Sequence, residues 1–185
     1  MFRIFYESTF IVTRITLKVA CFHYMMIVKR RVFLMANQVE PELTKPLFDS
    51  LQEERFALLS TIDFETGGPN VSAISWLLAK DKHTILFAVD NRSRIVKNIQ
   101  SNQAVVINVM ALESTYSISG DASIKEDKIE DIPLKLSLIQ IDVKEVRDVM
   151  FYGSKISTLP EYDKTYDLEA AKRLDNQVML AMKKA

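Results

Sequence analysis

Residues 35–185 predict an α+β fold whose core is a barrel of six antiparallel strands with flanking helices. Short runs of apolar and β-branched residues recur six times, and the connections between them are too short for parallel crossovers. Three further segments change to helical spacing. Six short strands in an open sheet would leave two exposed edges, and closure into a barrel removes that problem.

The strands are expected where apolar residues alternate or run continuously. They cover residues 56–63, 71–79, 84–89, 104–110, 116–124 and 139–143. The four polar residues 80–83 are short enough to join the second and third strands as a hairpin. Gly67-Gly68-Pro69 indicates a turn between the first and second.

Helical spacing predicts three main helices and one shorter piece. The first covers residues 43–55, the second follows Ser93 to residue 101, and the last begins after Asp167, a residue type favoured as N-cap. A short helical piece interrupted by Pro133 is expected at residues 129–136.

Residues 1–34 differ in composition from the rest of the chain. They carry six basic residues against Glu7 alone, and the longest stretch between charges is ten residues, too short for a membrane anchor or a secretory signal. We expect translation to begin at Met35, so that residues 1–34 are a doubtful N-terminal extension of the native protein. Residues 35–185 are expected to form one domain. The alternative is that these residues form an extra strand or helix that packs on the domain.

The composition disfavours several classes of function. From Met35 onward the net charge is −5, which offers no broad attraction to nucleic acid. Cys21 is the only cysteine, which suits the reducing cytoplasm, and no membrane association is expected. With only His23 and His83 as histidines and no zinc-type spacing, no metal site is expected. Acidic pairs such as Glu53-Glu54 are expected on the solvated surface.

Two segments could hold a ligand. Asp90-Asn91-Arg92-Ser93-Arg94 follows a strand and opens a helix, where free backbone N–H groups and arginines suit a phosphate. A capped helix with exposed arginines is the alternative. In the second expected strand, the small residues Ser72, Ala73 and Ser75 would let a flat ring approach the backbone, or would only mark tight packing at a bend.

Together these segments resemble the FMN-binding split-barrel family, the pyridoxamine 5′-phosphate oxidase-like proteins, and in particular its short general-stress-protein-like members. The resemblance runs from about Leu43 to Met150. Pro69, Val71 and Ser72 match the family's P-x-V-S opening. Ser93, Arg94, Asn98 and Ile99 match most of its [ST]-[RK]-K-x-x-N-[LI] motif, but Ile95 replaces the motif's lysine.

The resemblance implies a homodimeric split barrel that binds FMN and is a flavin-dependent oxidoreductase for an unidentified small molecule. A non-catalytic barrel that holds flavin or haem is the alternative. Further basic motifs of true pyridoxamine phosphate oxidases are not found, so vitamin B6 oxidation is not expected. No catalytic residue is identified. The expected cofactor-binding residues are Val71, Ser72, Ala73, Ser75, Arg92, Ser93, Arg94 and Lys97, with Lys97 or Arg92 compensating for Ile95.

Overall fold

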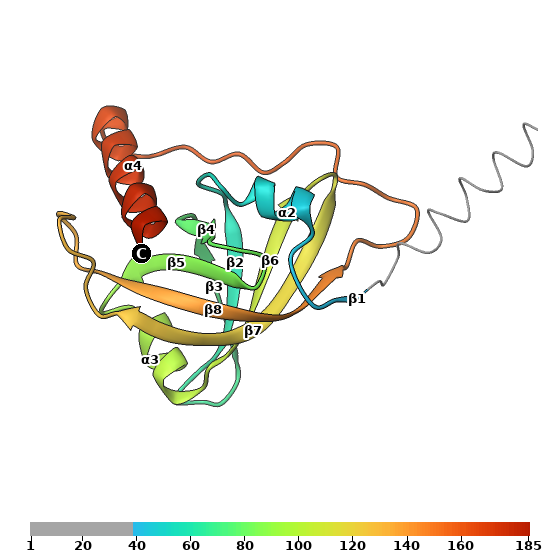
Figure 1. The fold of residues 1–185 in the computed structure, drawn as a ribbon, viewed down its shortest axis with the longest axis horizontal. Helices are drawn as coiled ribbons and strands as arrows, with labels where there is room; N and C mark the ends of the chain where they lie inside the picture. The colour runs from blue at the N-terminus through green and yellow to red at the C-terminus, as the bar shows by residue number, and fades with distance from the viewer. Residues whose placement is uncertain (1–38) are drawn as a thin grey trace, which may run out of the picture. The chain divides into compact units, whose positions relative to one another are not determined.

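The computed structural model describes residues 39–185, which form a strongly curled antiparallel sheet with three helices (Figure 1). Its hydrogen-bonded order is β3-β2-β6-β7-β8-β5-β4, and β1 pairs with β8. The predicted α+β split barrel is confirmed. The predicted strand count is wrong, because the sheet has eight strands and not six.

The strands range from two to thirteen residues. They are β1 (Val39–Glu40), β2 (Ala57–Ile62), β3 (Pro69–Ile74), β4 (Leu77–Ala79), β5 (Thr84–Asp90), β6 (Ala104–Ala111), β7 (Ser114–Glu126) and β8 (Leu136–Asp148). The helices are α2 (Lys45–Ser50), α3 (Arg94–Ser101) and α4 (Leu168–Lys184).

The difference in strand count has two sources. β1 is only two residues long, which is too short to show a periodic pattern. The strand expected at 71–79 is broken after Ile74, where the Ser75 carbonyl accepts hydrogen bonds from the backbone N–H groups of Arg55 (3.1 Å) and Leu77 (3.0 Å). As a result β3 pairs with β2, and only β4 forms the predicted hairpin with β5.

Two hydrophobic cores lie on opposite faces of the sheet. The larger fills the barrel, and α2 and α3 contribute buried residues such as Leu47 and Ile99 to it. The smaller lies between the outer face of β4, β5 and β8 and the helix α4, where Leu86 and Leu138 are in one cluster with Val178 and Met182. Burial on both faces explains why β5 has five consecutive buried residues instead of an alternating pattern.

Helices α3 and α4 begin where their capping residues predict, whereas the helix expected at residues 43–55 is only the six-residue α2, which has no side-chain cap. The Ser93 hydroxyl caps α3 by accepting from the Ile95 N–H (3.2 Å), and the Asp167 carboxylate caps α4 by accepting from the Ala170 N–H (2.6 Å). The prediction of a helical piece at residues 129–136 is wrong. That segment is a loop in which Asp131 has φ of 61° and the Ile129 N–H bonds to the Leu136 carbonyl, a geometry that no helix accommodates.

Residues 1–34 lie outside the described part of the chain, so the expectation that they form a separable extension stays a prediction. Among residues 39–185 no helix is both long enough and apolar enough to cross a bilayer.

Candidate functional site

The start of α3 gathers three of the cationic side chains that the sequence singles out. Asp90 ends β5, and its carboxylate accepts from the Arg92 backbone N–H (2.8 Å) and from the Arg92 guanidinium (3.1 and 3.2 Å). Both side chains of this pair are at least half exposed, so water screens the pair and it contributes little to stability. Arg92 therefore remains able to turn toward an anionic ligand.

Arg94 is held by two carboxylates from the segment that follows β2. Its Nε and Nη2 donate to the two oxygens of Asp63 (2.5 and 3.0 Å), and Nη2 also donates to Glu65 (2.6 Å). The Asp63 side chain is 7% exposed and its Oδ1 also accepts from the Thr66 N–H (2.9 Å). The fork from Arg94 and the bond from Thr66 hold the pKa of Asp63 far below its usual range. Among residues 39–185 the remaining guanidinium nitrogen, Nη1, has no acceptor.

A buried amide joins α3 to the same segment. The Asn98 side chain is completely buried, donates to the Thr61 hydroxyl (2.8 Å) and accepts from the Phe64 backbone N–H (3.0 Å). The Phe64 ring lies beneath two cations, 5.0 Å from the Arg94 guanidinium carbon and 5.7 Å from the Lys97 Nζ. Asn98 thus fixes the position of α3, and the cations of its first turn are placed at the β2–β3 end of the sheet.

The four expected residues of β3 and its end do not share one face. Val71 pairs with Ser60 and Ala73 with Leu58, and both Val71 and Ala73 are exposed on the outer face of the sheet. Ser72 pairs with the fully buried Leu59 and so faces the barrel interior. Ser75 lies beyond β3, about 20 Å along the strand direction from its first residue.

The outer face of β3, β2, β6 and the first part of β7 carries no charged side chain at its central positions. It is half exposed and combines apolar with small polar groups. Cross-strand pairing places on it Val71 and Ala73, Leu58, Ser60 and Ile62, Val106, Asn108 and Met110, and Thr115, Ser117 and Ser119. We call these residues the uncharged face. The described helix α4 covers β4, β5 and β8 instead.

Ser75 lies in a polar cluster that sequence reasoning missed. Lys164 Nζ donates to Glu54 (2.8 Å) and to Asp175 (3.1 Å), and the Trp76 indole N–H donates to the same Asp175 oxygen (2.9 Å). Burial raises the pKa of Glu54, but hydrogen bonds from Lys164, Tyr162 and Ser75 outweigh it, so the net pKa is lowered. The expectation of a solvated Glu54 is wrong, because its side chain is only 20% exposed.

The family model for pyridoxamine 5′-phosphate oxidase matches residues 43–150, which is more than half of the chain. The chain belongs to the pyridoxamine 5′-phosphate oxidase family. In this family member, residues 151–185 lie outside the match, and they include Lys164 and the whole of α4. No curated protein matches the chain.

Several solved structures resemble this chain at low sequence identity. A pyridoxamine 5′-phosphate oxidase-like protein from Lactobacillus delbrueckii is 15% identical with a TM-score of 0.52, over 60% of this chain and 98% of that one. HupZ of Group A Streptococcus is 16% identical with a TM-score of 0.49, over 63% and 99%. An FMN-binding protein from Syntrophomonas wolfei is 17% identical with a TM-score of 0.45, over 74% and 98%.

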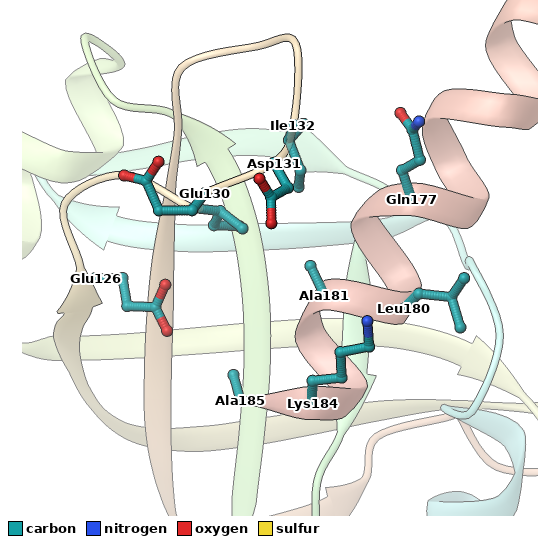
Figure 2. A pocket seen from close by; sticks show the side chains of 10 residues that line it. Glu126, Glu130, Asp131, Ile132, Gln177, Leu180, Ala181, Lys184 and Ala185 are labelled. Carbon is teal, nitrogen blue, oxygen red and sulfur yellow. The ribbon is translucent and has the colours of Figure 1, made fainter.

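Two cavities of about 400 Å³ each lie beside α4. Neither cavity is lined by a residue that was expected to bind the cofactor. Figure 2 shows the first, between α4 and the end of β7 with the loop that follows it. Its acidic side chains Glu126, Glu130 and Asp131 would repel a phosphate. Within the described residues no cluster of potential ligands could hold a metal ion. The second cavity is lined by Glu54, Lys164 and Asp175 together with one face of α4.

Proposed function

We propose that this chain is an FMN-binding protein and a flavin-dependent oxidoreductase that acts on an unidentified small molecule in the cytoplasm. The observation that carries the proposal is the position of the α3 cations beside an uncharged strand face in a domain of this family. A phosphate needs fixed positive charge and N–H donors, whereas a flat ring system needs an open surface without charge. The start of α3 and the outward side of β3 offer these two environments.

The residues at the start of α3 fit the phosphate of FMN. Lys97 forms no ion pair within residues 39–185 and lies over the Phe64 ring, and the exposed Arg92–Asp90 pair can exchange one anion for another. Arg94 presents Nη1 while Asp63 and Glu65 hold its other nitrogens in place. Asp63 is thus a positioning residue for Arg94. Ser93 is engaged as N-cap, and its hydroxyl retains a proton that it can donate.

The outward side of β3 fits the ring system. Val71 is 60% exposed, and Ala73 beside it leaves the backbone open to a flat ligand. Ser72 faces the interior, so it would contribute through its backbone and not through its hydroxyl. Bound FMN would supply the redox chemistry, accepting a hydride from one substrate and passing it to another. The chain's own contribution would be to orient the ring, exclude water and provide the local charge.

The uncharged face supports the expectation of a homodimer. A half-exposed sheet face of this width that lacks central charge is typical of a surface covered by another subunit. A second copy would cover the outer side of β3 and close the ring site. We expect an obligate interface with a total buried area above about 2,000 Å².

Light scattering at micromolar concentration should therefore give about twice the chain mass of 21.2 kDa. Asn108→Lys places a charge in the middle of the uncharged face and should give the monomer mass, whereas Lys128→Asn, in an exposed pair on the far loop, should not. A wild-type protein that scatters as a monomer would contradict the dimer.

Fluorescence titration tests the cofactor proposal. FMN should bind with at least about 10-fold higher affinity than riboflavin, because a charge-assisted contact to phosphate contributes roughly 1.5–3 kcal/mol. Anaerobic reduction of the bound flavin and its reoxidation by a specific small molecule would support the oxidoreductase. A bound flavin that no donor reduces would favour the non-catalytic module. Equal affinity for FMN and riboflavin would contradict a phosphate-binding site at the start of α3.

A further inference from the structure

The C-terminal segment of this chain, residues 151–185, contacts the residues around the end of β3 through Lys164, Tyr162 and Asp175. Between β8 and α4 the chain runs for nineteen residues without helix or strand, mostly exposed, and connections of this length are uncommon in compact domains. In this stretch Lys164 is a half-buried exception, with 23% of its side chain exposed.

Lys164 closes a ring of contacts around Ser75 and Trp76. Its ammonium group donates to Glu54, whose neighbour Arg55 donates its backbone N–H to the Ser75 carbonyl, and to Asp175, which accepts from the Trp76 indole. Ser75 and Trp76 are the two residues between β3 and β4. The ring of contacts therefore fixes the bend at which the sheet changes from β3 to β4.

Tyr162 adds a second link to the same place. Its hydroxyl donates to Glu54 (2.9 Å), and its ring packs against Phe56 at 6.2 Å between centroids, immediately before β2. The Lys164 ammonium also lies 5.5 Å from the centre of this ring. Apolar packing holds α4 on the sheet independently, through Val178 and Met182. Lys164 thus acts on the bend, and the attachment of α4 does not depend on it.

We propose that Lys164 is a positioning residue that sets the Ser75–Trp76 bend, and with it the ring end of the flavin site on β3. The inference rests on the proposed function. Without the ammonium group, Glu54 and Asp175 face each other with like charges, so they separate and the bend shifts with Ser75 and Trp76. The phosphate end, about 20 Å away along β3, stays as it is.

The effect on ligands should differ from that of losing a phosphate contact. Lys164→Met keeps the apolar stem and removes the charge, and it should weaken FMN and riboflavin together by about 3- to 30-fold. Lys164→Arg should restore both affinities, because a guanidinium can contact both carboxylates. Lys155→Met, which removes an exposed lysine of the same segment paired with Glu113, should change neither.

Trp76 provides an independent readout, because it is the only tryptophan of the chain. In the full-length protein, Lys164→Met should shift Trp76 emission to longer wavelength and increase its quenching by acrylamide. Should that variant fail to fold, Glu54→Gln weakens the same contacts with a side chain of equal size and should give the same results.

The outcomes separate this inference from the proposed function. A wild-type chain that binds neither flavin overturns the proposed function, and the inference falls with it. A wild-type chain that binds both, with Lys164→Met binding both equally well, overturns the inference alone. Failure of Lys164→Arg to restore the affinities, or loss of FMN affinity only, also overturns it.

Discussion

Arg94→Ala should lower the affinity for FMN by about 10- to 150-fold and leave the affinity for riboflavin almost unchanged. The reason is that the guanidinium offers Nη1 to the phosphate, while Asp63 and Glu65 hold Nε and Nη2. Flavin fluorescence titration of both ligands against both proteins measures the two ratios. The phosphate is the only difference between the ligands, so the comparison reports on that end of the site.

The same substitution also removes the partner of a buried carboxylate, so Arg94→Ala should melt below wild type. Riboflavin separates the two effects, because general damage to the fold would weaken both ligands. Arg173→Ala, an exposed arginine on α4, is the matched control and should change neither affinity nor melting temperature. Equal losses for FMN and riboflavin, or no loss for either, would remove Arg94 from the site.

Gly120→Ala should lower the melting temperature by about 3–12 °C, the largest stability effect of a single methyl group that we expect in this chain. A Cβ at Gly120 would meet the Asp142 carbonyl oxygen and the Ile141 side chain on β8 closer than any real contact allows. The register between β7 and β8 shifts at this point, so the two backbones approach each other there. Thermal unfolding followed by circular dichroism measures the effect.

Gly68→Ala is the matched control for that experiment. Its Cβ would meet only the Thr66 hydroxyl oxygen, at an ordinary 3.5 Å, and its φ is not in the left-handed region. The melting temperature of this variant should stay within about 2 °C of wild type. If Gly120→Ala were as stable as Gly68→Ala, the close approach of β7 and β8 would not be a constraint on the fold.

The local pattern of the sequence predicts most of the elements, because each one carries its own signal. Alternating apolar residues locate β7, and Ser93 and Asp167 mark the starts of α3 and α4. The break between β3 and β4 has no such signal, since it depends on hydrogen bonds from Arg55 and Leu77 to the Ser75 carbonyl. The apolar pattern predicts one continuous strand across such a bend, because the residues on both sides of it are apolar.

The candidate site is predicted in part for the same reason. Its cations lie within one short segment and can be found from spacing, but the partners that orient them come from elsewhere. Asp63 is 31 residues from Arg94, and Glu54 is 110 residues from Lys164. Nothing in the sequence around Asp63 or Glu54 distinguishes a carboxylate that holds a cation from one that faces water. Only the fold brings these charges together.

The visible absorption spectrum of the freshly purified full-length protein, before and after addition of FMN, is the most direct test of flavin binding. We expect the two-band spectrum of oxidised flavin on the protein as isolated, or its retention after FMN is added and free ligand is removed. Colourless protein that retains no FMN would show that the chain does not hold this cofactor, and a haem Soret band in place of the flavin bands would show that it holds another.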